Sequence, residues 1–298
     1  MRRFDEPRDR DRFDLDLFRT GNADLQIEGL YRLRRSAHEA ITVFGKAVYG
    51  ANLDATGGLT APPAIHDLPA EQQPKALAED EAARVAGAYL YALDEEATAA
   101  AVQLGSELPG FEPGSFERLA SRRLLLEAFD PPAPSGLLRW ASGVSYTCVG
   151  TPVIGCHWGP SPGGTWVAWW ADNRAATRAD VHSGVVNERQ AKEHLRVVGP
   201  LMFTELGVLL RSTAVPLPEP PAGPLPSQVE IAQYIALTAT LAASWALLIV
   251  PEAARVVTRA PTANQAAQDR RRGITPCPAT LASAPIDLDP IRRLPRNN

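Results

Sequence analysis

The sequence predicts an α+β fold with N-terminal helices, a central antiparallel Trp-rich sheet of three to four strands, a C-terminal helix, and disordered N- and C-terminal tails. Apolar residues recur at helical steps of three and four over much of the first 130 residues. From Gly136 the apolar pattern changes to the period of two that is typical of strands. With 298 residues, 45% of them hydrophobic, the chain can bury a sizeable core.

The first 134 residues divide into a charged arm and a helical region. Residues 1–20 alternate acidic and basic side chains, which favours a mobile arm, with a docking segment as the alternative. Residues 21–134 are expected to be helical, with helices over residues 24–50, 72–104 and 116–129. Glycines and prolines over residues 51–63 separate the first two helices.

Residues 135–213 carry the strand signals. Segments 137–149, 153–158 and 165–170 have the length and composition of strands and are separated by Gly/Pro-rich turns, which predicts an antiparallel meander. A helix is expected over residues 186–198, and the apolar segment 201–210 is a candidate fourth strand.

The last third of the chain starts with a proline-rich stretch. Residues 214–226 contain six prolines and are expected to form a semi-rigid linker. Residues 227–257 form an apolar helix, in which residues 231–250 lack charge and have the length of a membrane span. Six alanines and several polar residues weaken that signal, so a buried core helix is favoured over a span. Residues 258–298, rich in Pro, Arg and Ala, are expected to be disordered.

Charge and cysteine content narrow the class of protein. The net charge of −4 argues against a general polyanion binder, although local arginine clusters could still bind phosphates. Three cysteines form no paired framework, and the charged first 20 residues contain no secretory signal. The expected location is therefore the reducing cytoplasm.

Aromatic residues of the predicted sheet form a candidate interaction surface. Alternation places Trp166 and Trp170 on one face of their strand and Trp169 on the other. Either helices cover both faces of the sheet, or one face is an exposed platform that could stack on bases or sugars or bind a protein. The candidate residues are Trp140, Tyr146, Trp158, Trp166, Trp169 and Trp170.

Two groups of arginines are candidate polyanion contacts. One lies in the first predicted helix and the other near the end of the chain, and a solvated charged face is the alternative for each. The residues are Arg32, Arg34, Arg35, Arg270, Arg271 and Arg272.

Signals for catalysis, cofactors and metals are weak. Cys148, Cys156 and His157 lack the spacing of a zinc site, and alternation puts Cys156 and His157 on opposite faces of one strand. A triad of Cys156, His182 or His194, and Asp172 has no nucleophile motif around it. We therefore expect no catalytic residue, cofactor or metal site.

Three short segments carry a family resemblance. The succession GLLRW from Gly136, PVIGCHWGP from Pro152 and TWVAWW from Thr165 resembles a family of uncharacterised actinobacterial proteins found on plasmids, phages and integrated elements. The similarity extends over about residues 136–295. It implies an accessory role on a mobile element and assigns no catalytic residue.

Together these observations favour a non-enzymatic interaction or regulatory protein that contacts nucleic acid or a protein partner. One alternative is an enzyme or small-ligand domain at the predicted meander, with His157, His182 or His194 as general base. Another is attachment to a membrane through residues 231–250.

Overall fold

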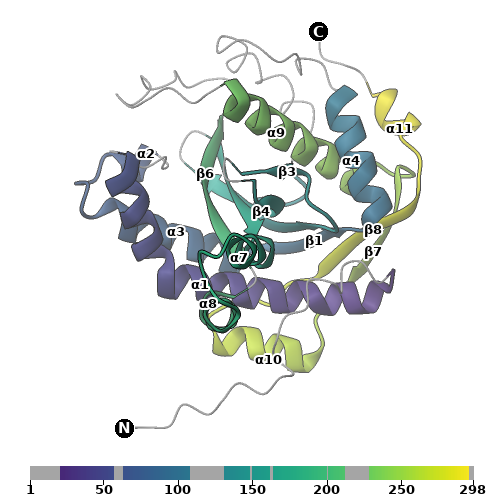
Figure 1. Cartoon of the computed structure of the whole chain (residues 1–298). Coiled ribbons are helices and arrows are strands. Elements are labelled where there is room, and N and C mark those ends of the chain that lie inside the picture. Colours follow the sequence, from purple (N-terminus) through teal and green to yellow (C-terminus); the bar gives the residue numbers. More distant parts are fainter. Residues whose placement is uncertain are drawn as a thin grey trace.

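A mixed β-sheet organises the molecule (Figure 1). The computed structural model describes residues 21–56, 63–107, 131–147, 150–161, 164–199, 201–211 and 228–294. Within these ranges the sheet has eight strands in the order β6-β5-β4-β2-β1-β8-β7, and β3 pairs with β4. The strands are β1 (Tyr89–Leu93), β2 (Gly136–Trp140), β3 (Ser145–Tyr146), β4 (Pro152–Ser161), β5 (Gly164–Asp172), β6 (Leu201–Arg211), β7 (Ala254–Arg259) and β8 (Ala279–Ile286).

The observed sheet has more strands than predicted, and not all of its strands are antiparallel. Strands β2, β4, β5 and β6 are antiparallel neighbours, as a meander requires. Strand β1, however, pairs in parallel with both β2 and β8, and β7 adds an antiparallel edge beyond β8. The α+β class is confirmed, whereas the sheet of three to four antiparallel strands is replaced by a larger mixed sheet.

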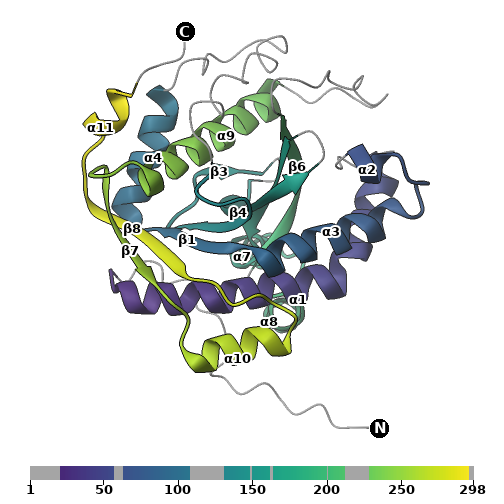
Figure 2. The same ribbon diagram turned by 180° about the vertical axis from the view of Figure 1, so that it is seen from behind.

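Helices cover both faces of this sheet (Figures 1 and 2). Helices α1 (Ala23–Thr56) and α3 (Gln73–Gly87) pack on one face, where Leu30, Ile41 and Leu77 form a core with side chains of the sheet. Helices α4 (Glu95–Glu107) and α9 (Gln228–Ile249) pack on the other, where Leu104 and Leu241 are buried. The other helices are α2 (Pro63–His66), α7 (Asn173–His182), α8 (Glu188–Val198), α10 (Ala263–Arg271) and α11 (Asp289–Arg292).

The predicted helix over residues 72–104 is wrong in its middle, because β1 lies between α3 and α4. Four of the five β1 residues are buried, and they alternate between the two cores: Leu90 faces α1 and α3, whereas Tyr91 and Leu93 face α4 and α9. A strand buried on both faces is a continuous apolar run, which spacing cannot distinguish from a buried helix. Asp94 then caps α4, because its Oδ1 accepts a hydrogen bond from the amide of Ala97 at 2.8 Å.

Residues 258–298 are ordered over most of their length, which corrects the prediction of a disordered tail. They contribute the end of β7, then α10, β8 and α11. Strand β8 pairs with β1 near the middle of the sheet, and Leu281 and Ala282 are buried. Composition missed this segment because several short elements joined by loops leave no long periodic pattern.

The apolar helix α9 packs inside the protein. Its residues Leu237, Leu241 and Trp245 are buried in the core that it shares with α4 and the sheet. No helix in the described ranges combines the length and the apolarity that crossing a membrane requires. The predicted arm over residues 1–20, the predicted helix over residues 116–129, the proline-rich linker over residues 214–226 and Cys148 lie outside the described residues.

Candidate polyanion-binding site

The five tryptophans of residues 140–170 are buried, so of the two alternatives for the sheet the structure has the covered faces and not the exposed platform. Trp166 and Trp170 pack in the core beneath α1 and α3, and Trp169 packs beneath α4 and α9, so both faces are covered. Each of the five is at most 2% exposed: Trp140, Trp158, Trp166, Trp169 and Trp170. Of the six predicted interaction residues, Tyr146 is the exposed one, at 58%.

Hydrogen bonds of the indole groups support a packing role for these side chains. Trp140 Nε1 donates to Ser244 Oγ of α9 at 2.9 Å, and Trp158 Nε1 donates to the carbonyl oxygen of Ala133 at 2.9 Å. Buried indoles with satisfied N–H groups contribute apolar area and fix orientation. These tryptophans therefore hold the layers together.

Two of the predicted phosphate contacts, Arg34 and Arg35, are buried and hold α10 against α1. Arg34 Nη2 lies 2.5 Å from Asp269 Oδ2, and Arg35 Nη1 lies 3.2 Å from Asp269 Oδ1. Both arginines are at most 8% exposed. Arg32 is half-buried, and its Nε lies 3.1 Å from Glu28 Oε1. The prediction is therefore wrong for Arg34 and Arg35.

The Arg34 guanidinium also links α1 by hydrogen bonds to the start of β1 and to the segment after α10. Its Nη1 donates to the carbonyl oxygens of Ala88 and Thr275, each at 3.0 Å, and to Cys277 Sγ at 2.8 Å. Tyr31 donates its hydroxyl proton to the carbonyl oxygen of Cys277 at 3.0 Å. Burial raises the pKa of Tyr31 to about 12 and raises the pKa of the Cys277 thiol. The thiol therefore stays protonated, which disfavours a nucleophilic role.

The second arginine group, Arg270 to Arg272, is exposed at the C-terminal end of α10. A capping box of Thr262 and Gln265 starts this nine-residue helix. Asp269, the single carboxylate in α10, is engaged by Arg34 and Arg35. Asp269 is thus occupied by two arginines of α1, and the side chains of Arg270, Arg271 and Arg272 are exposed to solvent.

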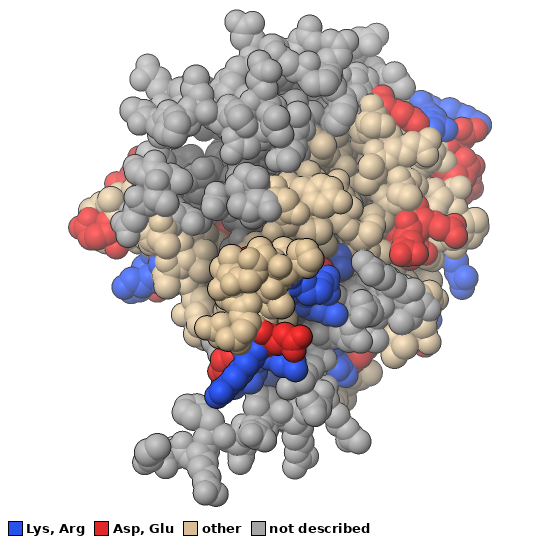
Figure 3. Space-filling view, in the orientation of Figure 1, with Lys and Arg blue, Asp and Glu red and all other residues tan. Residues whose placement is uncertain are grey.

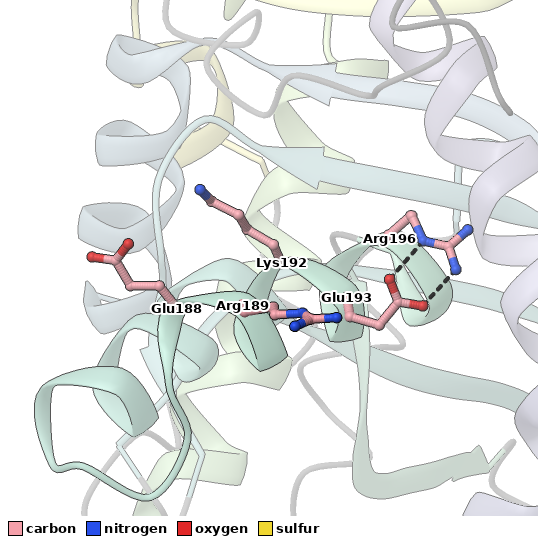
Figure 4. Close-up of a pocket in the computed structure, with 5 residues that line it drawn as sticks. All are labelled: Glu188, Arg189, Lys192, Glu193 and Arg196. Atoms are coloured by element: carbon pink, nitrogen blue, oxygen red, sulfur yellow. Dashed lines mark hydrogen bonds and ion pairs between the residues drawn. The ribbon is translucent and has the colours of Figure 1, made fainter.

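Helix α8 presents a second set of basic side chains. A capping box of Asn187 and Gln190 starts it. Arg189, Lys192 and Arg196 follow at spacings of three and four, which places them on one side of the helix. Together with Glu188 and Glu193 they line a hollow of about 610 Å³ (Figure 4).

The two glutamates of α8 do not neutralise all three of its basic residues, Arg189, Lys192 and Arg196. Glu193 faces Arg196, whose Nε donates to Glu193 Oε2 at 2.9 Å, while Lys192 extends away from that pair (Figure 4). Hydrogen bonds from Arg196 lower the pKa of the Glu193 carboxyl. Basic and acidic side chains lie next to each other over α8 in Figure 3. All five lining residues belong to one helix, so the hollow has one wall and lacks the enclosure of a catalytic cleft.

The ends of α8 and α10 meet the same segment of α1. Gly199, which follows α8, has φ +85°, and a Cβ built on it would lie 3.1 Å from Ser36 Oγ. Burial lowers the pKa of Arg35, and the nearby charge of Arg272 adds to this effect. Residues 34–36 of α1 therefore lie next to both Gly199, which follows α8, and Asp269 of α10, and both helices lie near α1 in Figures 1 and 2. We call Arg189, Lys192, Arg196, Arg270, Arg271 and Arg272 the basic surface.

The three histidines that could serve as general base lie in different environments. His157 is buried under α1 and α3, whereas His182 and His194 are exposed on α7 and α8. His194 Nε2 lies 3.2 Å from Asn173 Oδ1. Cys156 is buried in the opposite core, where burial raises its pKa well above the ordinary value. Over the residues that the structure covers, no three His, Cys, Asp or Glu side chains are grouped for a metal.

Sequence reasoning named Arg270 to Arg272 as candidate polyanion contacts but did not name the basic residues of α8. The signal was present, because Arg189, Lys192 and Arg196 fall at helical spacing within the predicted helix 186–198. The role of Asp269 had no comparable signal, since its partner Arg34 lies 235 residues away in the chain.

Comparison with known proteins adds no family assignment: no family model, curated protein or solved structure matches this chain.

Proposed function

We propose that this protein is a non-enzymatic binding protein that contacts the phosphate backbone of nucleic acid through its basic surface. The observation that carries the proposal is the convergence of α8 and α10 on residues 34–36 of α1, with Arg270 to Arg272 turned to solvent. Guanidinium groups match phosphate oxygens with two parallel N–H donors each. An accessory role on a mobile element, implied by the resemblance of residues 136–295, is compatible with such binding.

The overall charge sets the form of binding that we expect. A chain with net charge −4 is repelled by a polyanion except where its basic residues gather. Contact with phosphates also carries no sequence information. We therefore expect binding that is local, weakly selective for base sequence and strongly dependent on salt.

Replacing two arginines at the end of α10 tests the proposal. For the variant Arg271→Gln/Arg272→Gln we expect weaker binding to a labelled DNA duplex, because two phosphate contacts are lost. The slope of log K against log salt should fall in magnitude by about 2. Fluorescence anisotropy titrations of the full chain at several salt concentrations measure both quantities.

The matched control removes the same charge elsewhere. Arg255 and Arg293 are exposed at the start of β7 and beyond α11, away from the basic surface. Arg255→Gln/Arg293→Gln should keep the wild-type slope. An equal loss in both double variants, or wild-type protein that binds neither duplex nor single strand in a salt-dependent way, would contradict the proposal.

A further inference from the structure

Strand β7 is an edge of the sheet, and among the described residues β8 is its only strand neighbour. Four of its six residues are exposed, and Val256 is 41% exposed. The outer side of an edge strand carries backbone N–H and C=O groups that can pair with another extended segment. Strand β7 contains no proline, so each of its residues has an amide N–H. A further strand can therefore add to this edge.

The side chains of β7 determine which segment suits its edge. Opposite residues of antiparallel neighbours point to the same face, and Val257 lies opposite Leu281 of the core under α1 and α3. Arg255 and Arg259, each two residues from Val257, share that face, whereas Val256 points to the other one. A matching strand therefore has acidic side chains on the face of α1 and apolar side chains on the opposite face.

The sequence shortly before α1 has this pattern. Residues 13–18 read Phe-Asp-Leu-Asp-Leu-Phe, so in an extended segment Asp14 and Asp16 share one side and three apolar residues share the other. The two aspartates complement the arginines of β7, and the apolar side complements the exposed Val256. The segment has six residues, the same number as β7.

The start of α1 lies beside the end of β7 (Figures 1 and 2). Asp24 Oδ1 of α1 lies 3.9 Å from Arg259 Nε, and the Tyr31 hydroxyl donates to the carbonyl oxygen of Arg259 at 3.4 Å. Phe18 is three residues before Gly21, where the described chain begins, and such a link spans at most about 11 Å. The chain before α1 is therefore within reach of β7, with Phe18 nearest to Arg259.

We propose that residues 13–18 add a strand to the outer edge of β7. Because Phe18 starts from the end of β7 at Arg259, the added strand runs parallel to β7 and brings Asp14 beside Arg255. A second copy of the chain is a poorer occupant, because every charge on β7 is positive and two such edges would bring like charges together. The added strand covers an edge that would otherwise be open to association with other chains.

Hydrogen exchange of the full chain, followed by mass spectrometry, tests the pairing. We expect the amides of residues 13–18 to exchange more slowly than those of residues 1–10. Leu15→Pro removes a backbone donor in the middle of the segment, so it should abolish this protection and speed exchange in β7. The matched control Arg10→Pro should leave both unchanged. Fast exchange of residues 13–18 in the wild type, or no response of β7 to Leu15→Pro, would overturn the proposal.

Reversal of two charges tests which side chains face each other. Asp14→Arg and Arg255→Asp each put like charges side by side, so each should speed exchange of residues 13–18 by up to about fivefold, the scale of an exposed ion pair. The double variant restores opposite charges and should return the rate towards that of the wild type. Additive losses in the double variant, or protection that rises with protein concentration as pairing with a second copy requires, would contradict the proposal.

Discussion

At the scale of single residues, burial changes the acid–base chemistry of this protein more than any exposed charge does. Glu81 and His157 lie in the same core, and burial favours the neutral form of each. It raises the pKa of Glu81 to about 7, although the hydrogen bonds from Tyr49 and Trp166 act in the opposite direction. A core with two such groups makes stability depend on pH.

The sign of this dependence differs between the two residues. Folded Glu81 holds its proton more strongly than unfolded Glu81, so its contribution to stability is complete below pH about 4.5 and is lost as the pH rises to about 7. Folded His157 resists protonation, so its contribution is complete above pH 6.5 and is lost as the pH falls towards 3. The two effects oppose each other where the windows overlap, so a single profile of the wild type does not separate them.

Glu81→Gln isolates the first effect. As the pH rises from 4.5 to 7, the free energy of unfolding of the wild type should fall relative to that of this variant. The change should be on the order of 3 kcal/mol at most, because the variant has no carboxylate to bury. Urea unfolding of both proteins from pH 5 to 8 measures the difference. A difference that stays constant over this range would show that Glu81 titrates normally in the folded state.

At the scale of elements, close contact between helices depends on a small side chain. Gly105 near the end of α4 lies against the backbone of α9, and a Cβ at this position would be 3.0 Å from the carbonyl carbon of Ala239 and from the amide nitrogen of Thr240. The backbone of a buried helix cannot rotate away as a flexible side chain can. The packing of α4 on α9 therefore requires glycine here.

Gly105→Ala tests this contact, and Gly50→Ala in α1 is the matched control. Both substitutions add the same intrinsic helix propensity, roughly 1 kcal/mol. A Cβ on Gly50 meets nothing within 4 Å, so the control should keep that gain. We expect Gly105→Ala to be less stable than Gly50→Ala by about 1–3 kcal/mol in chemical denaturation, because α4 and α9 must separate. Equal stabilities of the two variants would show that α9 shifts to accept the new Cβ without loss of free energy of unfolding.

The element that sequence reasoning misassigned most clearly is β1. Its Leu90 and Leu93 also fit a helical spacing, and the alanine-rich segments on both sides favour a helix. The bulge between Val153 and Gly155 is a similar case. It puts Val153 and Cys156 in one core and Ile154 in the other, whereas regular alternation predicts Ile154 beside Cys156. Both depend on neighbouring strands that local sequence does not reveal.

At the scale of the whole molecule, the two ends of the described chain hold each other in place. Asp269 joins α10 to α1 through Arg34, across 235 residues of sequence. The side chains of Arg34 and Asp269 are 0% exposed. Removing one partner of such a pair leaves the other as an uncompensated buried charge.

Asp269→Asn should therefore destabilise the protein by about 3–5 kcal/mol. The matched control is Asp289→Asn, which removes a carboxylate whose partners Arg292 and Arg293 are exposed, and it should cost at most about 1 kcal/mol. Equilibrium unfolding in urea measures both variants. Similar losses for the two would mean that the Asp269 pair is as well solvated as a surface pair.

Local pattern was sufficient for the α+β class, for the first helix and for the strand segments 153–158 and 165–170, because each has a clear period and clear end signals. The predicted strand 137–149 instead divides into β2 and the short β3. Local pattern also placed Trp166 and Trp169 on opposite faces of one strand. Only the tertiary structure decided what covers those faces, which arginines are buried, and that residues 279–286 complete the sheet. Those properties depend on contacts between residues far apart in the chain, such as Arg34 with Asp269, and no local spacing encodes them.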